Sequence, residues 1–447
     1  HENEDRLGTG GKCVKIAVQT SQPAFQNDIG DVVRLFYGEG AAVEETQQAD
    51  ARLTHIHEEA DGEWRETFVL TDCSGRAEQN TLSTPAVFGG LEEKRQKKRL
   101  IKRCCYMLLK RLSGRQPAWG SLTGIRPTRL YYQQLENGKT RGEARHTLQD
   151  LFDLSQEKID LLDEILDAQQ GLMDRRARAC DVYIGIPFCT TRCAYCSFSS
   201  GEIGDGRLVE PYLAALLHEI EACAEMAREM GLHIRVGYIG GGTPSSLTTP
   251  QLDRLLAHVE RHFGALAEFT VEAGRPDTLD AQKLRMLRDH PVTRISINPQ
   301  TMNDATLTRI GRAHTAKQTV EAYELARSIG FDDINMDVIA ALPGEDYAMF
   351  AHTLAEIRRL RPESLTVHTL AIKRSSRLHE EKYAQAEQDV ARMVALGRQT
   401  AHDMGMRAYY LYRQKYMAEN LENVGYALPG RFCRYNIDNM EETTSIL

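Results

Sequence analysis

Residues 182–196 read Val182-Tyr-Ile-Gly-Ile186-Pro-Phe-Cys189-Thr-Thr-Arg-Cys193-Ala-Tyr-Cys196. The first five are mostly β-branched or aromatic, which is typical of a buried β-strand. Three cysteines follow within eight residues, directly after the predicted strand. We therefore expect a strand whose end carries a loop with three thiols close together.

From residue 181 onward, strand-like runs alternate with amphipathic helical runs six times. This alternation is typical of parallel strands joined by crossover helices. Because a closed eight-fold barrel needs two more units, the predicted fold is α/β, a partial (β/α)6 TIM-like barrel. Its active site is expected at the carboxyl ends of the strands. The six pairs are 182–186 with 208–230, 235–239 with 250–263, 269–272 with 279–289, 293–297 with helices through 326, 333–339 with 347–360, and 365–371 with 378–405.

The chain of 447 residues exceeds what one hydrophobic core usually serves. Four parts are predicted: an N-terminal α/β domain at 1–130, a helical linker at 131–178, the barrel at 179–405, and a separate, incomplete C-terminal appendage at 406–447. Within them, residues 91–113 predict a helix with a basic face, and residues 141–176 predict continuous helix with an N-cap at Ser155.

Composition restricts the class of protein. Hydrophobic residues make up 42% and charged residues 26%, as in ordinary globular proteins, and the net charge is −8. That acidity argues against a general nucleic-acid binder. No apolar run approaches the ~18 residues of a membrane span, and no signal peptide is visible. We expect a cytoplasmic, reduced protein with no membrane partner, in which most of the ten cysteines are buried thiols.

The cysteine cluster at 189–196 predicts a metal centre. A structural zinc site takes four ligands, and no fourth Cys or His lies nearby in the sequence. A disulfide would leave one thiol over. Three thiolates suit a [4Fe–4S] cluster in which one iron stays open to an exogenous ligand. The predicted metal ligands are Cys189, Cys193 and Cys196.

Polar and glycine residues recur at the ends of the next predicted strands. Gly240-Gly-Gly242 follows the second strand and allows close approach of backbone to a ligand. Glu272 ends the third, Gln300 follows the fourth, and Asp337 lies in the fifth. Such side chains face the site in barrel folds and accept hydrogen bonds from hydroxyl or ammonium groups.

The cysteine motif on this fold resembles the radical S-adenosylmethionine (SAM) superfamily. Over roughly residues 85–447, the sequence is similar to the oxygen-independent coproporphyrinogen III oxidase family, most closely to its coproporphyrinogen dehydrogenase branch. The family motifs are Tyr183-Ile-Gly-Ile-Pro-Phe-Cys189, Tyr238-Ile-Gly-Gly-Gly-Thr-Pro-Ser245, Gln300, Ile310-Gly-Arg-Ala-His314 and Asn335-Met-Asp-Val-Ile-Ala-Ala-Leu-Pro-Gly344. The branch motifs are Trp119-Gly-Ser-Leu-Thr-Gly-Ile-Arg-Pro-Thr128, Val271-Glu-Ala-Gly-Arg-Pro-Asp-Thr278 and Asn420-Leu-Glu-Asn-Val-Gly-Tyr426.

The resemblance implies the cofactors and their contacts. In the superfamily, the open iron binds the amino and carboxylate groups of SAM, and reductive cleavage gives methionine and a 5′-deoxyadenosyl radical. Tyr195 is placed to stack on adenine. The positions matching the family's SAM contacts are Tyr183, Tyr195, Gly241, Gly242, Thr243, Glu272, Gln300, Arg312, Asp337 and Ala371.

The resemblance also implies the reaction and the partners. The family converts two propionates of coproporphyrinogen III to vinyl groups in anaerobic haem biosynthesis, giving protoporphyrinogen IX. Arg312, Lys373 and Arg374 are candidates for binding the carboxylates of this tetrapyrrole substrate. The basic helix is a candidate docking face for a reducing flavodoxin or ferredoxin. Its cations are Lys94, Arg95, Lys97, Lys98, Arg99, Lys102 and Arg103.

Departures from the family pattern leave the substrate open. Gly185 stands where the typical oxidase has His, Ser197-Phe198 where it has Gly-Cys, and Asn298-Pro299 where Gly and an aliphatic residue are common. The alternatives are a haem-binding chaperone without decarboxylase activity, a radical SAM enzyme that modifies RNA, and a tetrapyrrole-degrading methyltransferase. The net acidity and the lack of an aromatic and basic recognition module argue against RNA.

Overall fold

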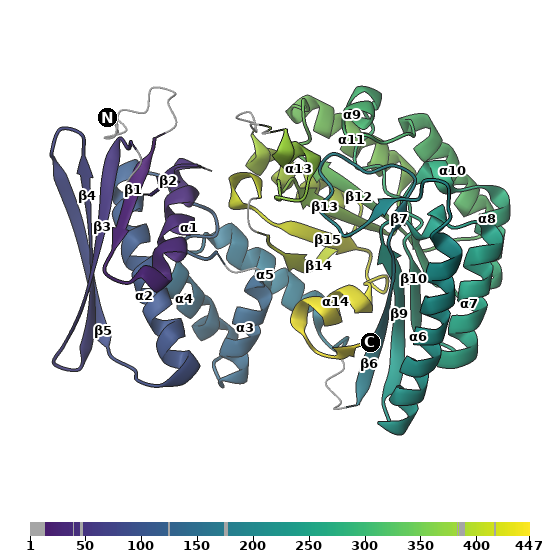
Figure 1. Cartoon of the computed structure of the whole chain (residues 1–447), viewed down its shortest axis with the longest axis horizontal. Helices are drawn as coiled ribbons and strands as arrows, with labels where there is room; N and C mark the ends of the chain where they lie inside the picture. The colour runs from purple at the N-terminus through teal and green to yellow at the C-terminus, as the bar shows by residue number, and fades with distance from the viewer. Residues whose placement is uncertain are drawn as a thin grey trace. The chain divides into compact units, whose positions relative to one another are not determined.

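The computed structural model describes residues 14–38, 40–44, 48–123, 126–173, 178–381, 383, 389–414 and 417–447. It divides into two compact units (Figure 1). The first comprises His1–Ile125 with Tyr131–Asp160, and the second comprises Arg126–Leu130 with Leu161–Leu447. The domain boundaries expected from sequence, including the linker at 131–178, stay predictions.

The first unit contains a five-stranded sheet, the helices α1, α2 and α4, and parts of α3 and α5. Its order is β2-β1-β3-β4-β5, with β1 parallel to β2 and β3 and the remaining pairs antiparallel. Helices α1 and α2 enclose a core that includes Val32, Phe36 and Leu109. The elements are β1 Ile16–Thr20, α1 Gln26–Tyr37, β2 Ala42–Val43, β3 Ala51–Ala60, β4 Glu63–Asp72, β5 Ala77–Pro85 and α2 Gly90–Ser113.

The predicted basic helix is α2, and several of its cations are already engaged. Arg95 lies 4.0 Å from Glu92, Lys97 lies 2.9 Å from Glu93, and Lys98 lies 2.6 Å from Asp28. Lys102 donates to Thr123, and the Arg99 guanidinium lies over the Phe152 ring. The face is therefore less positive than the sequence suggests.

The continuous helix predicted over 141–176 is wrong. The structure has α3 Pro127–Glu136, α4 Arg141–Phe152 and α5 Gln156–Gln169. Asp153 adopts a left-handed conformation (φ 56°) that ends α4, and its carboxylate accepts hydrogen bonds of 2.6 Å from both Tyr106 and Lys110. The predicted cap is confirmed, since Ser155 Oγ accepts from the backbone of Lys158. Residues 124, 125 and 174–177, within the branch motif at 119–128 and the predicted helix, lie outside the described residues.

The second unit confirms the partial barrel. Six parallel strands run in the order β13-β12-β11-β10-β9-β6, each beside its neighbour in sequence (Figure 1). They are largely buried, as parallel strands are when helices cover them. The elements are β6 Ala179–Ile186, β7 Phe188–Cys189, β8 Gly201–Glu202, α6 Val209–Glu229, β9 His233–Gly241, α7 Thr249–Phe263, β10 Glu268–Val271, α8 Ala281–Asp289, β11 Arg294–Ser296, α9 Asp304–Arg309, α10 Ala316–Ile329, β12 Ile334–Ala340, α11 Tyr347–Leu360, β13 Ser364–Thr369, α12 Arg377–Glu380 and α13 Val390–Asp403. Part of the predicted helix 378–405, at 382 and 384–388, lies outside the described residues.

The segment after residue 406 is part of the barrel sheet, which corrects the prediction of a separate appendage. Strands β14 (Arg407–Tyr412) and β15 (Asn423–Ala427) continue the sheet, β15 pairing antiparallel with β13. At the other edge, β16 (Ser445–Ile446) pairs with β6. An unclosed barrel leaves strand edges with unpaired backbone groups, and these segments satisfy them. Helix α14 (Arg434–Glu441) is held by the buried ion pair between Asp438 and Arg235 of β9.

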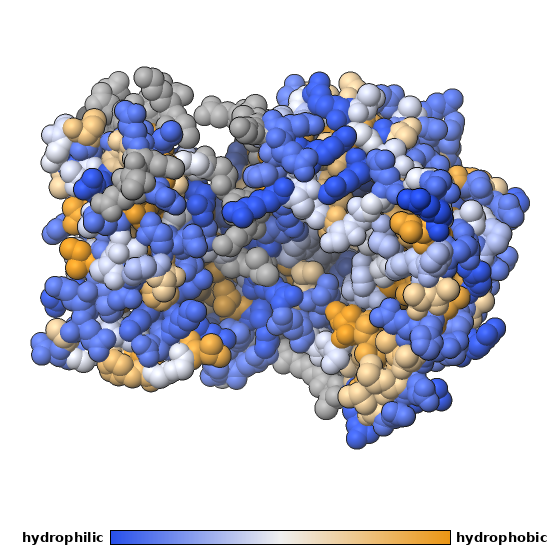
Figure 2. Space-filling model, viewed as in Figure 1, coloured by the Kyte–Doolittle hydropathy of each residue, from blue (hydrophilic) through white to orange (hydrophobic). Residues whose placement is uncertain are grey.

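Within the part of the chain that the structure describes, none of the helices combines the length and the apolar character that crossing a membrane requires. Hydrophilic residues predominate on the face drawn in Figure 2, and the hydrophobic ones form small scattered groups.

Candidate functional site

A cavity of about 560 Å³ opens at the carboxyl ends of the barrel strands. Every residue predicted from sequence as a metal ligand or a SAM contact lines it. Residues as far apart in sequence as Tyr183 and Ala371 meet there because parallel strands end on the same side of the barrel. These lining residues are Tyr183, Cys189, Cys193, Tyr195, Cys196, Gly241, Gly242, Thr243, Glu272, Gln300, Arg312, Asp337 and Ala371.

The cysteine loop leaves β6 and is anchored by backbone hydrogen bonds on both sides. The short strand β7 pairs with β8, which closes the loop on itself. Ala194, between the second and third cysteines, donates to Ile310 (2.9 Å) and accepts from Leu378 (3.0 Å). The loop is therefore held by residues from two other parts of the barrel.

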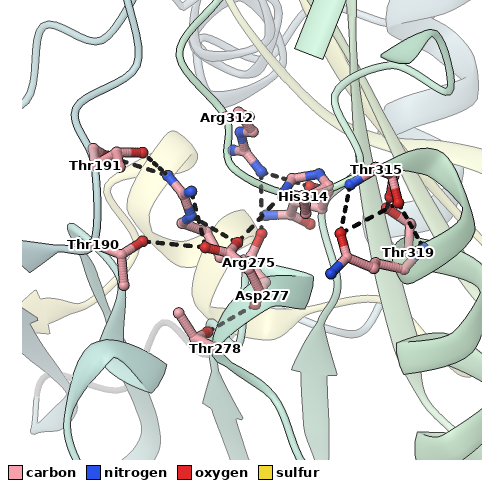
Figure 3. A network of polar contacts seen from close by, with 12 residues as sticks. Thr190, Thr191, Arg275, Asp277, Thr278, Arg312, His314, Thr315 and Thr319 are labelled. Atoms are coloured by element: carbon pink, nitrogen blue, oxygen red, sulfur yellow. Dashed lines mark hydrogen bonds and ion pairs between the residues drawn. The ribbon is translucent and has the colours of Figure 1, made fainter. Parts of the chain in front are cut away.

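A buried polar network supports the loop from below (Figure 3). The Arg275 guanidinium lies between Thr191 and Asp277, donating to Thr191 Oγ1 (2.9 Å) and to Asp277 Oδ2 (3.0 Å). His314 Nδ1 lies 3.4 Å from Asp277 Oδ1. Burial works to raise the pKa of Asp277, but the contacts with His314 and Arg275 outweigh it and hold the pKa below its usual range. Burial lowers the pKa of His314, which is only 2% exposed and is not among the residues that line the cavity.

The three sulfur atoms fit a multi-iron cluster better than a single ion. The ligands of one metal ion lie close together, and among the described residues the only three candidate ligand atoms within 4.8 Å of one another belong to Glu221, His258 and His262. The three cysteine sulfur atoms are therefore spaced more widely than the ligands of a single ion. Burial raises the pKa of the Cys196 thiol above its usual value, and the neighbouring sulfur atoms of Cys193 and Cys189 act in the same direction. Thr243 donates to Cys189 Sγ over 3.4 Å, which is the kind of hydrogen bond that tunes cluster sulfurs.

The glycines after β9 make room for the cysteine loop. Gly241 has φ 104°, a conformation that favours glycine. A Cβ atom at Gly242 would lie 2.7 Å from the Phe188 carbonyl oxygen and 3.0 Å from Cys189 Sγ. The sequence analysis assigned these glycines to the approach of a ligand. The structure adds that Gly242 is needed for the first cysteine to sit where it does.

Two carboxylates at strand ends differ in charge. Burial raises the pKa of Glu272 to about 7, although Tyr238 donates a 2.6 Å hydrogen bond to it. Burial also works to raise the pKa of Asp337, but His368, 3.7 Å away, together with Asn335, lowers it below the usual value. The site thus places one permanent anion beside one carboxyl that ionises near neutral pH.

Gln300 is held in a strained conformation with an unsatisfied oxygen. Its φ is 65°, fixed by backbone hydrogen bonds with Asp337 and Ile339 on β12. Its side chain is only 7% exposed, and Oε1 has no hydrogen-bond partner. Ser296 Oγ, on β11, is likewise buried and unpartnered. Two unsatisfied buried oxygens that line one cavity fit a polar ligand bound there.

Arg312 is already bonded within the protein. It donates to the carbonyl oxygens of Asn298 (2.8 Å) and Gly274 (3.4 Å) and to the Tyr195 hydroxyl (3.3 Å). The side chains of Arg312 and Tyr195 both line the cavity. Ala371 pairs with Met417 beside the same cavity, after the end of β13. Lys373 also lines the cavity, and its ammonium has no partner among the described residues, whereas Arg374 is exposed and lies outside the lining.

Four tyrosines that sequence reasoning did not select complete the wall. Tyr238 and Tyr435 stack with centroids 4.5 Å apart, and Tyr410 and Tyr412 are nearly parallel at 6.5 Å. The alternation of Tyr410 and Tyr412 predicts that both lie on one face of a strand. It predicts that this face meets the cavity only if the strand is assigned to the barrel. Tyr435 carries no such signal, because α14 reaches the cavity through the tertiary fold. His368 also lines the cavity.

Comparison with known proteins gives consistent matches. The Radical SAM superfamily matches residues 183–357. An oxygen-independent coproporphyrinogen-III oxidase-like protein HemZ from Bacillus subtilis is 41% identical over 384 residues, 84% of this chain and 77% of that protein. The heme chaperone HemW of Bacillus subtilis is 37% identical over 193 residues, 42% of this chain and half of that protein. The solved structure of coproporphyrinogen III oxidase (HemN) from Escherichia coli, described as a radical SAM enzyme, shares 25% identity and a TM-score of 0.49, covering 59% of this chain and 58% of that one.

Proposed function

Because this chain belongs to the radical SAM superfamily, and within it to the family of oxygen-independent coproporphyrinogen-III oxidase-like proteins, we propose that it decarboxylates propionate side chains of coproporphyrinogen III. The cofactors of the superfamily, a [4Fe–4S] cluster and SAM, are the cofactors of this chain. In the proposal, the three cysteines hold the cluster, and the ten further predicted residues of the cavity hold SAM. When bound, these cofactors supply the one-electron chemistry that removes a hydrogen atom from a substrate carbon.

The observation that carries the proposal is the composition of the cavity beyond the cofactor residues. Tyr410, Tyr412 and Tyr435 add a wall of aromatic rings, and near-parallel rings favour a ligand with a broad hydrophobic ring system. Lys373 adds a cation whose ammonium has no partner among the described residues. A tetrapyrrole with propionate arms offers both complementary features.

In this proposal each protein group has a physical task. The Lys373 ammonium binds a propionate, and the tyrosine wall holds the macrocycle so that one side-chain carbon faces the cofactors. Enclosure in the cavity excludes water from the reacting carbon. Per propionate, one hydrogen atom leaves to the cofactor, the carboxylate leaves as carbon dioxide, and one electron passes to an acceptor, which leaves a vinyl group.

The electron that starts each turnover needs a donor, and the basic face of α2 remains our proposed docking surface for an acidic flavodoxin or ferredoxin. Lys94 and Arg103 are both exposed, and neither has an ion-pair partner among the described residues. Reversing both charges is expected to slow cluster reduction by the protein donor and to leave reduction by dithionite unchanged. An unchanged rate with the protein donor would remove α2 from the proposal.

The test of function is an anaerobic assay. The cluster is reconstituted, dithionite, SAM and coproporphyrinogen III are added, and 5′-deoxyadenosine and porphyrin products are followed by mass spectrometry. Vinyl-bearing product that disappears in Cys193→Ala supports the decarboxylase. Deoxyadenosine without vinyl product keeps the radical chemistry and refutes this substrate. Stoichiometric haem binding with neither product would instead favour a haem chaperone like the HemW proteins, of which this chain matches 48% to 67% of the length.

A further inference from the structure

A second candidate metal site lies outside the cavity, on two helices that cover the barrel. His258 and His262 occupy successive turns of α7, and Glu221 faces them from α6. The carboxylate oxygen Glu221 Oε1 lies 3.4 Å from His258 Nε2 and 3.9 Å from His262 Nε2. One ligand atom from each residue lies within 4.8 Å of the other two, and within the described part of the chain no other group of three His, Cys, Asp or Glu does so.

The spacing matches a single divalent ion. Side chains four residues apart lie on one face of a helix, so α7 presents both imidazoles toward α6. Tetrahedral zinc holds nitrogen ligands at about 2.0–2.1 Å, which separates neighbouring ligand atoms by roughly 3.3 Å. The separations of 3.4 and 3.9 Å between Glu221 and the two histidines are close to that value, and all three ligand atoms lie within 4.8 Å of one another.

The partners of the three side chains leave the site available. Among the described residues, Glu221 has no Lys or Arg partner, and its charged neighbours are the two histidines. His258 Nε2 makes a 3.0 Å hydrogen bond to the carbonyl oxygen of Leu217, one turn before Glu221 on α6. That bond already turns the imidazole of His258 toward α6. A metal ion bound to Nε2 would take the place of the Nε2 proton and of this hydrogen bond. The His258 side chain is 11% exposed and that of His262 is 22% exposed, so the ion would reach the site from the Glu221 side, which is 51% exposed.

From this geometry we infer that Glu221, His258 and His262 bind a zinc-class divalent ion, with water completing the shell. Two imidazoles select such an ion over Mg²⁺ or Ca²⁺, which prefer oxygen ligands. The ion joins α6 to α7. These helices follow β6 and β9, the strands that carry the cysteine loop and the glycine motif. The site stabilises the part of the barrel that holds those loops, and it does not depend on the proposed function.

The experiment measures metal binding by the cluster-loaded protein under anaerobic conditions. Zn²⁺ affinity is measured by competition with a chromogenic chelator, and Co²⁺ is used as a spectroscopic substitute for zinc. Glu221→Gln and His262→Ala are compared with His352→Ala, an exposed histidine on α11 that serves as the matched control. Two different variants are used so that misfolding of one does not decide the result, and circular dichroism checks the fold of each.

We expect one Zn²⁺ per chain in addition to the cluster iron, and a Co²⁺ spectrum without thiolate charge-transfer bands. Affinity should fall at least about 100-fold in Glu221→Gln and His262→Ala and stay unchanged in His352→Ala. Zn²⁺ should also raise the melting temperature of the wild-type chain and not that of His262→Ala. Equal binding by wild type and both site variants, thiolate bands in the cobalt spectrum, or binding only at large metal excess would overturn the inference. None of these readouts uses SAM cleavage, so the proposed function is tested separately.

Discussion

Glu272→Gln is expected to make the protein more stable and a weaker binder of SAM. The carboxyl of Glu272 is partly buried and lines the cavity just after the end of β10, and burial raises its pKa from 4.5 to about 7. Above neutral pH the folded protein must hold a charge that it solvates less well than water does. Glutamine keeps the shape and the oxygen that accepts from Tyr238, but it removes the charge.

The magnitude and its pH dependence follow from the two pKa values. A carboxyl whose pKa is higher in the folded state ionises first in the unfolded state, so it lowers stability as pH rises from about 4.5 to about 7. The full difference corresponds to about 3 kcal/mol at pH 8. At pH 5 the same calculation leaves less than about 1 kcal/mol. Glu272→Gln should therefore gain close to the full amount at pH 8 and little at pH 5.

Calorimetry of the cofactor-free protein at the two pH values measures this gain as a shift in the melting temperature of the barrel unit. The chain has two tryptophans, Trp64 and Trp119, and both lie in the first unit. Their fluorescence is an internal control that should not shift. Glu345→Gln is the matched control, because Glu345 is also buried with a raised pKa but lies outside the cavity lining.

SAM binding gives the second half of the prediction. Losing a charged hydrogen-bond acceptor costs about 1.5–3 kcal/mol, which is roughly a 10- to 100-fold weaker affinity. Glu345→Gln should bind SAM normally. An equal gain in stability at pH 5 and pH 8 would refute the charge argument. Unchanged SAM affinity in Glu272→Gln would refute the placement of this residue at the cofactor.

Three further predictions concern the same cavity. Gly242→Ala should lower iron content after reconstitution, because its Cβ would press on Phe188 and Cys189, whereas Gly142→Ala, which meets nothing within 4 Å, should load normally. Lys373→Ala should raise the KM for a propionate substrate about 10-fold or more and leave SAM binding intact; an equal effect of Arg374→Ala would show that the charge acts only at long range. Thr243→Val should keep the iron content but make the cluster harder to reduce, because it removes the hydrogen bond to Cys189 Sγ; an unchanged potential in redox titration would contradict this.

The cofactor half of the cavity could be predicted from sequence because its residues lie next to strong local patterns. The three cysteines fall directly after a strand, and Glu272, Gln300 and Asp337 lie at the ends of successive strands. Parallel topology then brings these ends together without further information. Their environments could not be predicted: the left-handed backbone of Gln300 and the raised pKa of Glu272 arise from tertiary contacts.

The rest of the cavity was missed because the signal for a return strand is weak. Residues 407–412 contain three tyrosines in six positions, which reads equally well as a small separate core. Only the unpaired edge of β13, a property of the whole sheet, determines that β15 and then β14 pair there. In the same way, the break at Asp153 depends on Tyr106 and Lys110 from another helix, so helical periodicity alone could not reveal it.

The difference between the cofactor half of the cavity and the rest of its wall bears on the choice between a decarboxylase and a haem chaperone. The similarity to HemW proteins covers 42% to 60% of this chain, whereas the similarity to HemZ covers 84% of it. A cysteine loop and a set of polar strand ends serve any protein that binds the cluster and SAM, so they cannot discriminate between the two functions. The groups that we propose meet the second ligand are Tyr410, Tyr412 and Tyr435 from the returning strands and helix, together with Lys373 after β13, all of which line the cavity. Under the proposed function, specificity for the tetrapyrrole resides in the part of the barrel that sequence patterns describe least, and substitutions there should change the substrate without changing the cofactors.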